Sequence, residues 1–159
     1  MLKTLTRLAA IATVAVTFST QAAEAPIAKS GLITLKSHHS VPQTVNRLVR
    51  ALNEKKMTIF TRIDHAAGAA KVDLKLPATQ VVIFGNPKIG TPLMKCAPTI
   101  AIDLPQKALI WEDKAGDVWF AYNRPTYLKE RHNVDGCKDL FMKVENAMAA
   151  FANAATKAD

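Results

Sequence analysis

The pattern of apolar and polar positions predicts a strand and an amphipathic helix at the start of the folded region. Residues 31–37 alternate between apolar and polar side chains, as a strand with one buried face does. Ser40 and Gln43 then have the spacing of a capping box, which predicts a helix start. Behind them, apolar residues recur every three or four positions and form one helix face: Val41, Val45, Leu48, Val49 and Leu52.

The next two apolar segments predict strands. Residues 57–64 alternate, and a short helical turn over residues 65–70 is expected to follow. We expect one face of this strand to hold every second residue: Met57, Ile59, Thr61 and Ile63. Residues 79–84 are a run of β-forming residues typical of a central strand, and the turn signal Gly85-Asn86-Pro87 ends it.

The second half of the chain predicts a hairpin followed by helices. Prolines and glycines break residues 88–105 into short pieces, whereas residues 107–112 and 118–122 predict two hairpin strands. Arg124-Pro125 opens a short helix, and Asp135 is expected to cap a last helix. The buried stripe of that last helix is expected to hold Cys137, Leu140, Phe141, Val144, Met148 and Phe151.

This order of elements predicts the fold class. A strand, a helix, several strands and a helix make a two-layer α+β domain, expected over residues 31–155. The two helices are expected on one face of an antiparallel sheet. The length is ordinary for one domain, and nearly half of the residues are apolar, which is enough for a proper core.

The start of the chain predicts export. Two basic residues precede an uncharged apolar run over residues 8–18, and Thr20 and Ala22 are small residues of the kind signal peptidase needs. Cleavage after Ala22 makes residues 1–22 a signal peptide and residues 23–30 a flexible leader. The alternative is a retained membrane anchor, but a bilayer span needs about 20 apolar residues and this run has roughly half that. We therefore expect a periplasmic or secreted protein with no stable membrane anchor.

The charge changes this picture little. Without Lys3 and Arg7, the remaining 19 basic and 13 acidic residues give a net charge of about +6. The basic residues are scattered without a dense run, which indicates a solvated, mildly cationic surface rather than a binding patch. Export also argues against a nucleic-acid partner.

Two cysteines, Cys96 and Cys137, are present in a chain bound for an oxidising compartment, where a disulfide persists. The bridge is a candidate only, because spacing does not show whether their Cα atoms lie within reach. The alternatives are a buried structural cysteine or a nucleophile with a histidine base.

Short motifs resemble a known family. They are, in chain order, residues 63–67 (IDHAA), 84–94 (FGNPKIGTPLM), 103–105 (DLP), 111–113 (WED) and 122–128 (YNRPTYL) with Arg131-His132. These motifs and their order are similar to the domain of unknown function 302 family over almost the whole chain after the leader. The resemblance implies a TATA-binding-protein-like β-α-β4-α fold and a homodimer. It implies no established reaction and no accepted substrate.

Polar residues near strand ends are candidates for a ligand site. Asn86, Lys88 and Thr91 follow a predicted strand and could hold a small anion or carboxylate. The alternative is that the Asn-Pro and Gly-Thr-Pro sequences only shape a tight connection. Tyr122 and His132 are the other residues expected to line a cleft or an interface.

Two histidines are candidates for metal or haem. His65 and His132 both lie in the family-like motifs, and imidazole is a common ligand of metal ions and of haem iron. The alternative is that each histidine hydrogen-bonds a neighbour and holds a loop or helix end in place. No HExxH, CxxC or CxxCH spacing is present, so the strong sequence signals for such sites are absent.

Together these features favour a non-catalytic periplasmic module that binds a small ligand or a protein partner. No residues form a persuasive catalytic triad. The second hypothesis is a metal- or haem-binding protein that uses His65 and His132. The third is a cysteine-dependent redox or hydrolytic enzyme, which requires a free thiol of low pKa.

Overall fold

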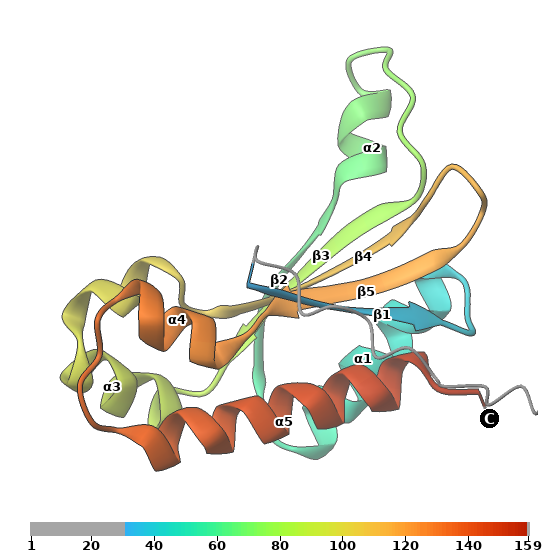
Figure 1. Ribbon diagram of the computed structural model, residues 1–159. Helices are drawn as coiled ribbons and strands as arrows, with labels where there is room; N and C mark the ends of the chain where they lie inside the picture. The colour runs from blue at the N-terminus through green and yellow to red at the C-terminus, as the bar shows by residue number, and fades with distance from the viewer. Residues whose placement is uncertain (1–30, 159) are drawn as a thin grey trace, which may run out of the picture.

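The computed structural model describes residues 31–158 (Figure 1). The expected signal peptide (residues 1–22) and the expected leader (residues 23–30) lie outside the described residues. The strands are β1 (Leu32–Ser37), β2 (Thr58–Asp64), β3 (Thr79–Gly85), β4 (Gln106–Glu112) and β5 (Val118–Asn123). The helices are α1 (Val41–Glu54), α2 (His65–Ala70), α3 (Pro87–Cys96), the 3-10 helix η1 (Pro98–Ile102), α4 (Pro125–Arg131) and α5 (Lys138–Thr156).

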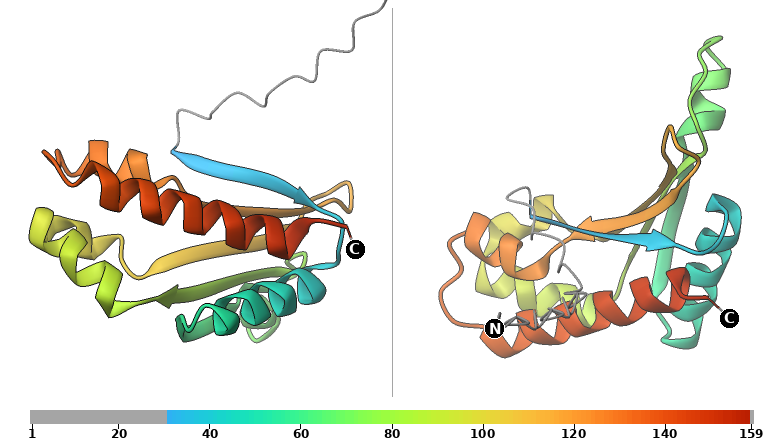
Figure 2. Two further views of the ribbon diagram at one scale, coloured as in Figure 1. Left: turned by 90° about the horizontal axis from the view of Figure 1, so that it is seen from below. Right: turned by 45° about the vertical axis from the view of Figure 1, so that its right-hand side comes forward.

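The five strands form one antiparallel sheet in the order β1-β5-β4-β3-β2. Helices α1 and α5 pack against each other and cover one face of this sheet (Figures 1 and 2). The predicted two-layer α+β class and the β-α-β4-α order are therefore confirmed. Helix α2 projects from one end of the sheet, whereas α3, η1 and α4 gather at the opposite end (Figure 1).

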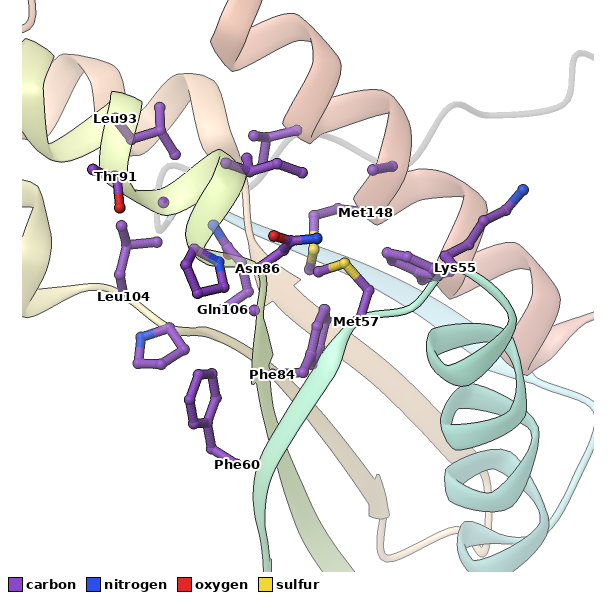
Figure 3. Close-up of a pocket in the computed structure, with 18 of the residues that line it drawn as sticks. Lys55, Met57, Phe60, Phe84, Asn86, Thr91, Leu93, Leu104, Gln106 and Met148 are labelled. Atoms are coloured by element: carbon purple, nitrogen blue, oxygen red, sulfur yellow. The ribbon is translucent and has the colours of Figure 1, made fainter.

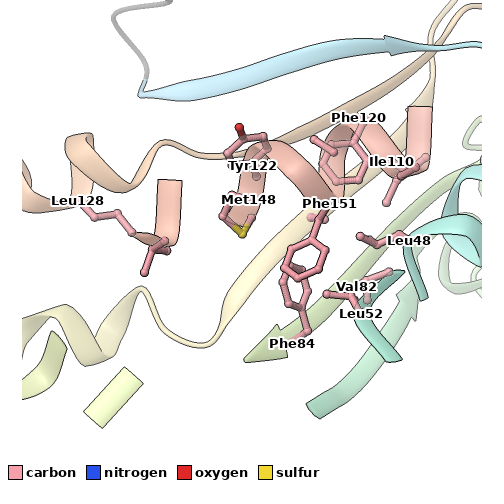
Figure 4. Close-up of a cluster of buried hydrophobic side chains, with 14 of the residues drawn as sticks. Leu48, Leu52, Val82, Phe84, Ile110, Phe120, Tyr122, Leu128, Met148 and Phe151 are labelled. Carbon is pink, nitrogen blue, oxygen red and sulfur yellow. The ribbon is translucent and has the colours of Figure 1, made fainter. Parts of the chain in front are cut away.

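The core lies between the two layers (Figure 4). Phe84 of β3 meets Phe151 of α5 edge to face, with ring centroids 5.9 Å apart. Leu48 and Leu52 of α1 are fully buried beside them, as their helical spacing predicts. Burial of large apolar side chains of this kind is the main favourable term in folding.

The start of α1 forms as its sequence predicts. The backbone N–H of Gln43 donates to Ser40 Oγ at 3.4 Å, and the backbone N–H of Ser40 donates to Gln43 Oε1 at 3.1 Å. This reciprocal pair satisfies two backbone donors that the first helical turn leaves without partners. The capping box therefore sets the first residue of the helix.

A β-bulge in β2 contradicts the expectation that four residues share one face. Ile59 lies opposite Phe84, but Thr61 lies opposite Ile83, the immediate neighbour of Phe84. The extra residue between them, Phe60, exchanges the two faces of the strand. Ile59 and Ile63 therefore point to opposite sides of the sheet, because a slip of one residue reverses the alternation.

Two helix boundaries also differ from expectation. Helix α3 continues through Pro92, although an interior proline normally ends a helix. Burial of Leu93 in the core and the bridge at Cys96 hold this helix in place. The expected cap at Asp135 is wrong: α5 begins at Lys138, after Cys137 has adopted a left-handed φ of 52° that interrupts helical geometry.

The sheet face turned away from α1 and α5 carries an apolar row. Ile63, Val81, Leu109 and Ala121 lie opposite one another on four neighbouring strands. Along their strands these residues alternate with residues of the inner face, so their four side chains point outward. Ile63 is 40% exposed.

Candidate ligand-binding site

A cavity of about 490 Å³ opens where the ends of β2 and β3 meet α3 and α5 (Figure 3). This volume falls in the range of sites that bind small organic molecules. Its lining is mostly apolar and includes Met57, Phe60, Phe84, Leu93, Leu104 and Met148. Methionine side chains adapt to irregular shapes, so this lining suits an apolar body of variable outline.

The turn after β3 positions one wall of the cavity. Asn86 caps α3, and its Oδ1 accepts a hydrogen bond from the Lys88 amide N–H at 2.9 Å. Pro87 occupies the first helical turn, where its missing N–H leaves no carbonyl without a partner. The motif read from sequence as a turn is therefore a helix start. It turns Gly90 and Thr91 toward the cavity.

A disulfide holds the far end of this wall. Cys96, the last residue of α3, is joined to Cys137 before α5, with Cα atoms 6.6 Å apart. The sequence contains two cysteines and both are in this bridge. A cysteine nucleophile therefore has no free thiol in this state, and the cysteine-dependent hypothesis would require the bridge to open.

The five residues predicted to line a ligand site do not gather at one place. Asn86 and Thr91 line the cavity, whereas Lys88 is exposed outside its lining. Tyr122 is buried on the inner face of β5 beside Phe120. Burial raises the pKa of the Tyr122 phenol, and the negative charge of Glu145 acts in the same direction.

His132 lies in a polar cluster at the end of α4. Its Nε2 is 2.6 Å from Oδ2 of Asp103, and its Nδ1 is 3.1 Å from Oγ1 of Thr99. Arg131 Nη1 is 3.4 Å from the other carboxylate oxygen of Asp103. The His132 and Asp103 side chains are largely buried. This cluster connects the η1 segment to α4. His132 therefore has the structural role given above as the alternative to metal or haem binding: it hydrogen-bonds its neighbours and holds a helix end in place.

We expect His132→Ala to lower the free energy of unfolding by about 2 kcal/mol, because it removes two hydrogen bonds and leaves a largely buried carboxylate short of a donor. Urea unfolding followed by circular dichroism measures this difference. His65→Ala is the matched control, since His65 is exposed on α2 and its loss should change stability by less than about 0.5 kcal/mol. Equal stability of both variants would contradict the structural role of the cluster.

The structure does not bring His65 and His132 together within one chain. His65 begins α2 at one end of the sheet, and His132 follows α4 at the other end (Figure 1). Within residues 31–158, no group of three His, Cys, Asp or Glu side chains is placed to hold a metal ion. A site shared by the two histidines would need a second chain, and it stays a prediction.

Asp113 organises the turn between β4 and β5. Its Oδ2 accepts from the Trp119 indole N–H at 2.7 Å, and its Oδ1 accepts from the amides of Ala115 and Asp117. The hydrogen bond from Trp119 is the main reason that the pKa of this carboxyl lies below its usual range. Asp113 therefore shapes the hairpin and is not part of the cavity.

The sequence reasoning missed most of the cavity lining. Phe60 reaches the cavity because of the bulge in β2, and Gln106 reaches it from the first position of β4. The sequence did contain a signal for a helix in this wall, namely the spacing of the apolar residues Ile89, Leu93 and Met94. The prolines and glycines of the same segment obscured it. That spacing fits one face of a helix.

Between residues 31 and 158, no helix combines the length and the apolar character needed to cross a bilayer.

Comparisons with known proteins agree with this fold. The family model described as "Domain of unknown function DUF302" matches residues 33–151. A crystal structure of an uncharacterised conserved DUF302 protein from Bacillus stearothermophilus superposes with a TM-score of 0.71, at 16% identity, over 79% of this chain and 98% of that one. At that identity the likeness supports the fold alone.

Curated relatives share a closer sequence match. The proteins named fluoride-specific ion channel FluC 1 of Brucella suis biovar 1 and Brucella abortus biovar 1 are each 45% identical over 119 residues, or 75% of this chain. The match covers 47% and 44% of those two proteins. The chain thus spans about half the length of the curated relatives that it matches.

Proposed function

The chain belongs to the family described as domain of unknown function DUF302, and we propose that this member is a non-catalytic binding protein for a small apolar ligand. The observation that carries this proposal is the apolar cavity between α3, α5 and the ends of β2 and β3. Concave sites that are mostly apolar, with a few polar groups, are the usual places where proteins bind small molecules.

The chemistry of the lining favours binding over catalysis. Among the described residues around the cavity, the polar side chains are Lys55, Asn86, Thr91 and Gln106. None of these is a carboxylic acid, an imidazole or a thiol, the groups that most often transfer protons or attack substrates. The cavity can therefore hold and orient a molecule, but its lining offers little to change one chemically.

We further propose that the protein acts in the periplasm. The apolar leader over residues 8–18 supports this location, as does the bridge between Cys96 and Cys137. Disulfides persist in oxidising compartments and are rare in the cytosol. Amino-terminal sequencing of the protein from a periplasmic extract tests the location. An intact Met1 terminus on cytosolic material would count against it.

A homodimer remains part of the proposal. The outward residues Ile63, Val81 and Leu109, which are exposed or half-buried, support it, because accessible apolar residues on a sheet face favour association. The molar mass measured by light scattering in solution distinguishes one chain from two. The partner, whether a second copy or a periplasmic protein, is not required for the cavity itself, which one chain builds alone.

Fluoride is not the ligand that this cavity favours. Fluoride is a small, strongly hydrated anion, and methionine, leucine and phenylalanine side chains cannot replace its water. The name fluoride-specific ion channel therefore describes those relatives, of which this chain spans about half, and we do not extend it to this protein.

Filling the cavity should abolish binding. Gly90 and Leu104 both line the cavity, and a Cβ built on Gly90 lies 3.9 Å from Leu104 Cδ1, so we expect the ring of Gly90→Phe to occupy part of the cavity. We expect this variant to weaken binding of the uncharged fluorescent probe N-phenyl-1-naphthylamine at least tenfold, which is about 1.4 kcal/mol. Fluorescence titration measures the change.

The matched control is Gly68→Phe. Gly68 also lies in a helix, α2, where an added Cβ meets nothing within 4 Å, and it is not part of the cavity lining. This variant should bind the probe as the unmodified protein does. If the unmodified protein fails to bind the probe, or if Gly90→Phe binds it equally well, the proposed function is wrong.

A further inference from the structure

Gln106 is a buried polar residue that faces the cavity without a protein partner. It is the first residue of β4, its side chain lines the cavity, and the residue is only 8% exposed. Within residues 31–158, its side-chain amide makes no hydrogen bond to another group. Most buried polar side chains in folded proteins have such a partner, whereas the Gln106 amide is open to water only through the cavity. This amide therefore marks where a bound molecule can supply one.

A second amide lies next to it. Gln106 is directly opposite Phe84 across the β3–β4 ladder, and Asn86 follows Phe84 by two residues, on the same side of the chain. The two amides are thus diagonal neighbours, and both line the cavity (Figure 3). The Asn86 Oδ1 already accepts from the Lys88 amide, so its NH₂ group is the part that remains to donate. Together, the side-chain amides of Gln106 and Asn86 offer a bound molecule more hydrogen-bond donors than acceptors.

The charges around the cavity decide what kind of acceptor fits these donors. Lys55 is the one charged side chain among the described residues of the lining, and it is exposed at the end of α1. A carboxylate placed beside Gln106 would therefore be buried without an adjacent cation, which is costly. An uncharged carbonyl oxygen accepts the same hydrogen bonds without that cost.

From this arrangement we infer the ligand class: an uncharged amphiphile whose carbonyl group, as in a ketone, an ester or an amide, is attached to an apolar chain. Its carbonyl oxygen accepts hydrogen bonds from the amides of Gln106 and Asn86. Its chain lies against Met57, Phe84 and Met148. This inference rests on the proposed function, because it names the ligand of the same cavity.

The test compares three probes of equal chain length: 2-nonanone, nonane and nonanoate, each measured by displacement of N-phenyl-1-naphthylamine. We expect the unmodified protein to bind 2-nonanone about tenfold more tightly than Gln106→Leu does, the effect of one good hydrogen bond. It should also prefer the ketone to nonanoate. Gln106→Leu keeps the size of the side chain and removes its donors, so it should bind nonane as tightly as the unmodified protein does.

Gln80→Leu is the matched control. Gln80 lies on the adjacent strand β3, outside the lining, and its amide donates to Asp64 Oδ2 at 3.2 Å. This variant should bind 2-nonanone as tightly as the unmodified protein does. Infrared spectra provide a measurement that needs no variant: the carbonyl stretch of bound 2-nonanone should lie at lower frequency than in hexane. A band at the hexane frequency would overturn the inference.

The outcomes separate the inference from the proposal on which it rests. Equal binding of 2-nonanone by the unmodified protein and by Gln106→Leu would overturn the carbonyl-bearing ligand while leaving a binding protein for apolar molecules. Tightest binding of nonanoate, lost in Lys55→Ala, would overturn it in favour of an anionic head. Failure of all three probes and of the fluorescent probe to bind would remove the proposed function itself.

Discussion

Replacing both cysteines by serine lowers the free energy of unfolding by about 4 kcal/mol. The Cys96–Cys137 bridge joins residues 41 positions apart in sequence and so removes many conformations from the unfolded chain. In the folded protein it joins the end of α3 to the start of α5, two elements that otherwise meet only through side-chain packing. The loss is a large fraction of the stability of an ordinary domain.

Urea unfolding followed by circular dichroism measures this difference. The unmodified protein should lose a similar amount of stability when a thiol reductant is added, whereas the double variant Cys96→Ser/Cys137→Ser should not respond to the reductant. We also expect the double variant to bind N-phenyl-1-naphthylamine more weakly, because α3 forms one wall of the cavity. Equal stability of both proteins with and without reductant would show that the bridge contributes nothing to the fold.

Gly31→Ala should be the second most damaging change, with a loss of about 3 kcal/mol in the free energy of unfolding. Gly31 has a φ of +72°, and a Cβ at this position would lie 2.3 Å from Cγ of Tyr127. The backbone has little room to move away, because the Gly31 carbonyl accepts from the Arg124 amide at 2.8 Å. The substitution therefore combines backbone strain with an overlap against an aromatic ring.

Gly116→Ala separates these two causes. Gly116 has a φ of +83°, but an added Cβ there meets nothing within 4 Å. This control should lose only the strain energy, about 1 kcal/mol. Adding Tyr127→Ala to Gly31→Ala should remove the overlap, so the two changes should be less damaging together than their separate effects suggest. Losses of equal size at Gly31 and Gly116, measured by urea unfolding, would mean that Tyr127 imposes no constraint.

Local sequence was sufficient for most of the secondary structure. Alternation predicted β1, the Ser40–Gln43 pair predicted the start of α1, and the β4–β5 hairpin follows from two apolar runs around a polar turn. These signals are local: each depends on residues within a few positions of one another, so an isolated sequence contains them. The same signals in their order were enough for the two-layer class.

Long-range contacts overruled local signals at three places. The bulge at Phe60 has no mark in the alternating pattern of β2, because the register is chosen by pairing with β3. Helix α3 keeps Pro92 because Leu93 is buried and Cys96 is bridged. Helix α5 begins at Lys138 and not after the predicted cap Asp135, because Cys137, which is bridged to Cys96, adopts a left-handed conformation.

The candidate site shows the same division. The sequence placed Asn86 and Thr91 directly after a strand, and both line the cavity. It also grouped Tyr122 and His132 with them, but Tyr122 is buried in the core and His132 is hydrogen-bonded to Asp103. Gln106 attracts no attention in the sequence, since a glutamine at the start of a strand is ordinary. Its significance arises because folding places its amide beside Asn86 in the wall of an apolar cavity. Burial and proximity are properties of the whole chain, so no local pattern reveals them.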